Sequence, residues 1–139
     1  FFNDSASTEI YHPSLHAALP ICLVENSAKM GDALFRALKS AFGDHPHVGD
    51  VRGGKGLLAA VEFVEDRSTK KNFATDEKIG LRLQNQMKRL GVITRSRPAV
   101  GADPAPGDEI LFAPPLIIRE SEIDRLVNVL VDAVGIVIR

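Results

Sequence analysis

Two arginines, Arg95 and Arg97, stand on either side of Ser96 in the segment VITRSR, residues 92–97. The segment has the pattern of a short β-strand, in which alternate side chains point to the same face. The two guanidinium groups therefore share one face, and a planar group of this kind can bind a carboxylate through two parallel hydrogen bonds. The same spacing is equally compatible with one arginine in a structural ion pair and the other in solvent. Arg95 and Arg97 are thus candidates for binding the carboxylate of a substrate.

The glycine-rich stretch RGGKG, residues 52–56, is a candidate for binding phosphate. A Walker-type loop requires G-x-x-x-x-G-K-[ST], and a helix must begin directly after it. Here Leu57 follows the last glycine and the next residues have a strand pattern, so no helix N-terminus is available to hold a phosphate. The glycines instead predict a tight connection between two strands, because glycine adopts positive φ without strain.

His45 and His47 flank Pro46, and no cysteine or acidic residue stands at the spacing of a zinc site. We interpret the two histidines as part of a solvated loop and predict no metal site. The sequence also contains no nucleophile elbow and no Ser, His and Asp set of the hydrolase type. The residues alone therefore assign no catalytic group.

The bulk composition limits the classes of protein to which the chain can belong. It has 139 residues, 45% of them hydrophobic, and a formal net charge of −1, which together predict one globular domain. The balanced charge offers no basic surface for nucleic acid, and the apolar runs are far shorter than a membrane span. The single cysteine, Cys22, excludes an internal disulfide and fits the reducing conditions of the cytoplasm.

Periodic apolar patterns predict the elements that position these residues. Helices are expected over residues 23–42, 75–90 and 120–134, and strands over residues 47–52, 57–66, 92–97 and 109–113. Thr75 or Asp76 is the expected N-cap of the second helix, and Gly91 its C-terminal glycine. The third helix has an apolar stripe consisting of Ile123, Leu126, Val127, Leu130, Val131 and Val134.

The first two strands are joined by only a few residues and should therefore pair antiparallel. The element order predicts an α+β domain of two layers, in which a small, mainly antiparallel sheet carries helices on one face. The Pro/Gly-rich residues 98–107 form the expected loop between the last two strands.

Residues 1–22 differ from the rest of the chain. They lack a sustained strand or helix period, and Pro13 and Pro20 interrupt their only weakly helical part, SLHAAL. The segment also resembles the peptide encoded by a translated sequencing-adapter DNA. We expect residues 1–22 to be a non-native or disordered leader and the domain to occupy residues 23–139; a natural N-terminal arm is the alternative.

Five segments together resemble the C-terminal part of class III aminotransferases, which are pyridoxal-phosphate enzymes of fold type I. The likeness is nearest to the omega-transaminases, covers about residues 22–139 and is specific only as a set. The segments are LVENSAKMGDAL (23–34), VRGGKGLLAAVEFVED (51–66), GVITR (91–95), ILFAPPLII (110–118) and EIDRLVNVL (122–130).

The resemblance implies an enzyme that moves an amino group from an amine or amino acid to a keto acid such as pyruvate, with pyridoxal 5′-phosphate as cofactor. In that family the Schiff-base lysine and the aspartate at the pyridine nitrogen belong to a large domain upstream of this segment. No lysine of this chain matches that motif, so no catalytic, cofactor-binding or metal-binding residue is assigned. The 139-residue chain alone is expected to be inactive, and a homodimer is expected for the whole enzyme.

The resemblance also implies that this small domain closes over the active site and helps to select the substrate. An arginine just after the GV-I strand can turn inward to pair with a substrate carboxylate, or outward for an apolar amine. Arg95 occupies the matching position, and Arg97 is the second choice. The loop at residues 98–107 would permit such movement.

Two departures from the family pattern stand out. RGGKG has one glycine more than the usual V-R-G-x-G-L, which predicts a looser hairpin. Arg119 replaces the usual threonine before the last helix, so Ser121 is the expected N-cap. The alternative function is a free-standing, non-catalytic domain for carboxylate binding or dimerisation.

Overall fold

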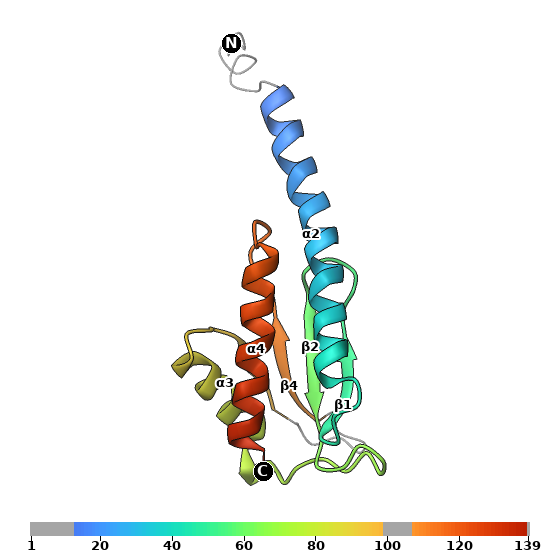
Figure 1. Ribbon diagram of the computed structural model, residues 1–139, viewed down its shortest axis with the longest axis vertical. Coiled ribbons are helices and arrows are strands. Elements are labelled where there is room, and N and C mark those ends of the chain that lie inside the picture. Colours follow the sequence, from blue (N-terminus) through green and yellow to red (C-terminus); the bar gives the residue numbers. More distant parts are fainter. Residues whose placement is uncertain (1–12, 99–106, 139) are drawn as a thin grey trace, which may run out of the picture.

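The structure, a computed structural model, describes residues 13–98 and 107–138, with side chains from residue 22 onward. Within these residues, a four-stranded antiparallel sheet has the order β1-β2-β4-β3 and carries helices on one face (Figure 1). The strands are β1 (Val48–Arg52), β2 (Ala59–Phe63), β3 (Arg95–Arg97) and β4 (Asp108–Phe112). The helices are α2 (Pro13–Phe42), α3 (Ile79–Arg89) and α4 (Glu120–Val137), with a 3₁₀ turn, η1 (Thr75–Glu77), before α3. The predicted α+β, two-layer fold is confirmed.

The two central strands, β2 and β4, give the sheet its buried face. Val61 pairs with Ile110 in the register, and both side chains are fully buried. Phe63 and Phe112 point to the same side and are at most 3% exposed. Because successive side chains alternate, Ala60 and Leu111 must point to the opposite, open face of the sheet. The candidate site includes residues of this open face.

Helix α2 covers β1 and β2 with an apolar stripe at intervals of four residues. Leu34, Leu38 and Phe42 are at most 1% exposed, as the sequence predicted. The predicted start at residue 23 is wrong, because the helix begins at Pro13 and includes Pro20. A proline in a helix interior removes one i→i−4 hydrogen bond and disfavours the preceding turn, which is why the sequence indicated an interruption at Pro20. The N-terminal part of α2 extends beyond the other elements (Figure 1).

Helix α3 begins later than predicted and ends as predicted. Neither Thr75 nor Asp76 caps it; both lie in η1, and Lys78 adopts a left-handed conformation between η1 and α3. At the other end, Gly91 has φ +86° and its N–H donates to the Lys88 carbonyl. The Val92 N–H donates to the Met87 carbonyl at 2.9 Å, which completes a Schellman cap.

Helix α4 begins after Arg119, whose backbone N–H donates to Glu122 Oε2 at 2.9 Å. Arg119 is therefore the N-cap residue and Glu122 the N3 partner of a capping box, so the prediction of Ser121 as the N-cap is wrong. The predicted apolar stripe is confirmed at Ile123, Val127 and Leu130, but Val131 is 43% exposed. Residues 99–106, which form most of the predicted mobile loop, and residues 1–12 lie outside the described part of the chain.

Candidate functional site

Arg95 is held in place by local structure on both sides of strand β3. The Schellman cap of α3 turns the chain at Gly91 and leads directly into this strand. Thr94 Oγ1 donates to the Leu111 carbonyl at 2.5 Å, and the Ser96 N–H donates to Gln84 Oε1 at 3.1 Å. These bonds tie the strand to β4 on one side and to α3 on the other. The backbone that carries Arg95 is therefore fixed although its side chain is exposed.

The sheet register sorts the charged side chains of the open face into two rows. Arg52 pairs with Ala60, Ala60 with Leu111, and Leu111 with Arg95, so the first row has an arginine at each end. The second row runs from Asp50 through Glu62 and Glu109 to Arg97. Arg95 and Arg97 therefore share one face of the sheet, as their alternation predicted.

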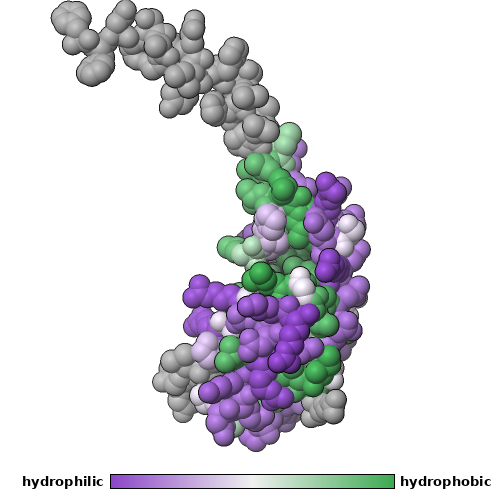
Figure 2. Space-filling view, turned by 90° about the vertical axis from the view of Figure 1, so that its left-hand side faces the viewer, coloured by the Kyte–Doolittle hydropathy of each residue, from purple (hydrophilic) through white to green (hydrophobic). Residues whose placement is uncertain are grey.

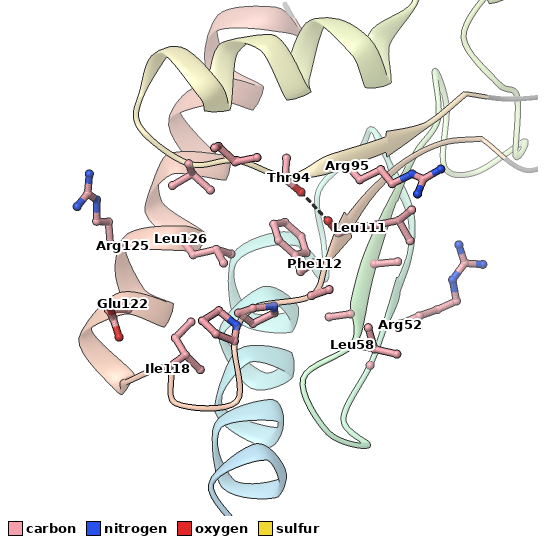
Figure 3. Close-up of a pocket in the computed structure, with 18 of the residues that line it drawn as sticks. Arg52, Leu58, Thr94, Arg95, Leu111, Phe112, Ile118, Glu122, Arg125 and Leu126 are labelled. Carbon is pink, nitrogen blue, oxygen red and sulfur yellow. Dashed lines mark hydrogen bonds between the residues drawn. The ribbon is translucent and has the colours of Figure 1, made fainter. Parts of the chain in front are cut away.

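The first row forms one side of an open pocket of about 960 Å³. Figure 3 shows Arg52 and Arg95 on the side formed by the sheet, and Glu122 and Arg125 on the opposite side, on α4. Between them the lining is apolar and includes Leu58, Ala60, Leu111, Phe112, Ile118 and Leu126. Figure 2 shows that apolar side chains gather in the upper part of the body, where α2 leaves it, while the lower part is mainly polar.

The three arginines of the open face differ in their partners. Arg52 Nη2 donates to Glu109 Oε1, and Arg97 Nη1 lies 3.8 Å from Glu109 Oε2. Arg97 is not among the residues that line the pocket. For Arg95, the described part of the chain contains no carboxylate within ion-pair distance. An exposed guanidinium at the edge of an apolar pocket can bind an incoming carboxylate through two charge-assisted hydrogen bonds.

The glycine-rich stretch forms the turn that its sequence predicted. Gly53, Gly54 and Gly56 all have positive φ and connect β1 to β2. The turn also packs closely on α2, where a Cβ on Gly31 would lie 2.1 Å from the Gly56 carbonyl oxygen. The glycines therefore supply the positive φ angles of this connection, and Gly31 allows its close contact with the helix.

The histidine pair closes the loop between α2 and β1. The His47 N–H donates to His45 Nδ1 at 3.2 Å, and His47 Nδ1 lies 2.7 Å from the carbonyl oxygen of Glu65. Partial burial and, to a smaller extent, the nearby His47 hold the pKa of His45 below 6.5. In residues 13–98 and 107–138, no three His, Cys, Asp or Glu side chains gather so as to hold a metal ion.

The pocket around Arg95 does not by itself form a site for pyridoxal phosphate. None of the residues that line the pocket is a lysine or an aspartate, so the pocket offers neither a Schiff-base amine nor a carboxylate for the pyridine nitrogen. We therefore derive no chemical step through that cofactor from this part of the protein.

Sequence reasoning missed two residues of this face, Arg52 and Glu109. Arg52 has the same alternation from Asp50 that drew attention to Arg95 and Arg97. Glu109 is a charged residue inside the otherwise mostly apolar stretch EILF, and its side chain is only 6% exposed. A charge in a strand of this kind is a signal for a buried ion pair, but it does not reveal the partner.

Comparison with known proteins assigns the family. The sequence model of the family "Aminotransferase class-III" matches residues 2–134. The chain therefore belongs to the class-III aminotransferase family.

Relatives and solved structures agree with this assignment. The chain is 34% identical to the uncharacterized aminotransferase YodT of Bacillus subtilis over 96% of its own length and 31% of the relative's. It is 37% identical to a taurine–pyruvate aminotransferase of Bilophila wadsworthia, over 76% of this chain and 22% of that protein. It is similar to the structure of an (S)-enantioselective omega-transaminase from Thermomicrobium roseum, with TM-score 0.76 and 36% identity over 90% of this chain and 26% of that one. The chain thus spans less than a third of the length of these proteins.

Proposed function

We propose that the whole protein is a pyridoxal-phosphate-dependent aminotransferase, of which residues 23–139 form the C-terminal small domain. It would move an amino group from an amine or amino acid to a keto acid such as pyruvate. The family assignment supports this proposal, as do relatives named for taurine–pyruvate and diaminobutyrate–2-oxoglutarate transamination. The cofactor would supply the electron sink for the transfer and be held by residues outside this chain.

In this proposal, the pocket between the sheet and α4 forms part of the substrate site, and Arg95 binds the substrate carboxylate. The observation that carries it is the position of Arg95 at the edge of an apolar pocket, with no carboxylate partner among the described residues. An apolar pocket accommodates the carbon skeleton of an amine, while one guanidinium orients the carboxylate of a keto acid. Arg97 is the second choice, because it does not line the pocket and its Nη1 lies 3.8 Å from Glu109 Oε2.

Three further properties belong to the same proposal. We expect the whole enzyme to be a homodimer, as the family likeness implies, and to act in the cytoplasm, which the single cysteine supports. Its substrates are small molecules, and neither nucleic acid nor membrane is an expected partner. Among the described residues, no helix is both long and apolar enough to cross a membrane.

The test compares Arg95→Gln with Arg97→Gln in the full-length enzyme recovered from the source DNA. Loss of a charged hydrogen bond to the substrate should raise the KM for pyruvate about tenfold or more in Arg95→Gln. In the same variant, the KM for an apolar monoamine donor, which has no carboxylate, should change less than about twofold. Arg97→Gln should change the KM for pyruvate and the KM for the donor by less than about threefold. Equal effects of the two substitutions would contradict the assignment of Arg95.

The 139-residue chain provides a second test. With added pyridoxal phosphate, it should show no transamination of any amine and keto-acid pair, because its pocket offers no lysine. Measurable turnover by the purified chain would overturn the proposal that the catalytic group lies elsewhere in the protein.

A further inference from the structure

A turn between β4 and α4 borders two hollows of the surface. The Ile118 N–H donates to the Pro115 carbonyl at 3.0 Å, which closes a β-turn over residues 115–118. On one side, Pro114, Pro115 and Ile118 line the pocket that contains Arg95 (Figure 3). On the other side, the turn lines a smaller hollow of about 520 Å³ together with residues of α2. The turn is therefore a wall of the pocket, and α2 lies behind it.

Asn26 of α2 holds this turn through its side-chain amide. Its Nδ2 donates to the Leu116 carbonyl at 2.6 Å and to the Ile118 carbonyl at 3.2 Å. An amide nitrogen carries two hydrogens, so one side chain can satisfy both carbonyls. Asn26 is not among the residues that line the pocket, but it does line the hollow behind the turn. It can therefore affect the pocket only through the position of the turn.

The middle of the turn has little packing of its own. Ile118 is only 6% exposed, whereas Leu116 and Ile117 are 47% and 72% exposed. Backbone that is exposed and makes few buried apolar contacts opens most easily. The hydrogen bond from Asn26 to the Leu116 carbonyl therefore fixes the turn at the point where side-chain burial contributes least.

We propose that Asn26 is a positioning residue of the substrate pocket, because it holds the wall formed by Pro114, Pro115 and Ile118 in the place where the apolar part of an amine donor binds. The inference rests on the proposed function and adds a substrate class, amines with a long apolar chain. A wall that is already fixed does not have to be ordered when the substrate binds, and this favours binding. A long chain covers more of the apolar lining than a short one and must contact this wall. Asn26 therefore affects the binding of long amines more than that of short amines.

The experiment compares Asn26→Leu with the original full-length enzyme, using two amine donors with pyruvate as the acceptor. Leucine has nearly the shape of asparagine and a higher helix propensity, but it cannot donate a hydrogen bond. The KM for 2-aminooctane should rise at least about fivefold, because the turn must be ordered on binding. The KM for 2-aminopropane, and kcat with either donor, should change less than about twofold. A general loss of structure would affect both donors alike, so the ratio of the two KM values separates positioning from stability.

Glu25→Leu is the matched control. Glu25 precedes Asn26 in α2, is exposed and is not among the residues that line either hollow. The same side chain placed there leaves both hydrogen bonds to the turn intact, so the ratio of the two KM values should change less than about twofold. If Asn26→Leu does not fold, Asn26→Asp keeps the shape and the polarity but removes both N–H donors. The ratio should again rise at least about fivefold.

The outcomes separate this inference from the proposed function. If the original enzyme transaminates both amines but the ratio is unchanged in the Asn26 variants, the inference is wrong and the proposed function stands. The same conclusion follows if Glu25→Leu raises the ratio as much, or if the enzyme accepts amino acids but not 2-aminooctane, because the pocket would then not receive a long apolar chain. If the original enzyme transaminates neither amines nor amino acids, the proposed function itself fails.

Discussion

Replacing Gly31 with alanine should destabilise the fold, because this position is where α2 contacts the turn between β1 and β2. An added Cβ would lie 2.1 Å from the Gly56 carbonyl oxygen, 2.3 Å from its carbonyl carbon and 2.9 Å from its Cα. All three are backbone atoms, so no side chain can rotate away to make room. The turn would have to move by about 1 Å, in an interior that is packed as densely as a crystal. That movement would also disturb Gly54, which lies against the ring of Phe35.

The magnitude follows from two opposing contributions. Overpacking a core by a methyl group costs about 1–3 kcal/mol, and the upper end applies when backbone must move. Alanine returns about 1 kcal/mol through its higher helix propensity. We therefore expect a net loss of about 2 kcal/mol in the free energy of unfolding.

Gly135→Ala is the matched control, since it makes the same substitution in another helix. No atom lies within 4 Å of a Cβ placed on Gly135, which is exposed in α4. This variant should gain about 0.5–1 kcal/mol from helix propensity alone. Urea unfolding of the purified chain, followed by far-UV circular dichroism, compares the two. A Gly31→Ala chain as stable as the unaltered one, with an unchanged denaturant slope, would refute the proposed close packing.

Three further predictions concern stability. The pKa of His45 is held below 6.5 in the folded protein. As the pH falls, the unfolded chain therefore takes up a proton at His45 at a higher pH than the folded protein does. The contribution of the neutral His45 ring to the free energy of unfolding should be complete above pH 6.5 and should be lost as the pH falls through the pKa of the folded protein. In His45→Gln, the free energy of unfolding should therefore depend less on pH in this range. Leu83→Ala leaves a cavity at a fully buried position in α3 and should lower the free energy of unfolding by about 2–5 kcal/mol. Leu81, in the same helix, is 48% exposed, so Leu81→Ala should change the free energy of unfolding by less than about 0.5 kcal/mol. Glu122→Ala removes the carboxylate that accepts from the Arg119 N–H and should cost about 0.5–2 kcal/mol; Glu120→Ala should cost less, and equal losses in thermal denaturation would argue against this cap.

Local patterns predicted most of the elements because their causes are local. The apolar stripe of α2 and the terminating Gly91 of α3 depend on residues within a few positions along the chain. The antiparallel pairing of β1 with β2 followed from the short, glycine-rich connection between them. The starts of α2 and α3 were predicted wrongly, since weak helix signals at Pro20 and around Lys78 do not fix where a helix begins.

The sequence by itself determined that Arg95 and Arg97 share one face, because alternation is a property of any strand. Only the tertiary structure decided which of them lines the pocket and has no carboxylate partner in residues 13–98 and 107–138. That outcome depends on Glu109 in the neighbouring strand β4, which attracts Arg97 and binds Arg52, a residue 57 positions away in the chain. Ion pairs form between atoms that are close in space, and sequence spacing does not record such closeness once strands from distant segments pair. The position of Arg95 at the pocket edge, with no carboxylate partner among the described residues, therefore depends on the sheet order β1-β2-β4-β3 and not on the segment VITRSR alone.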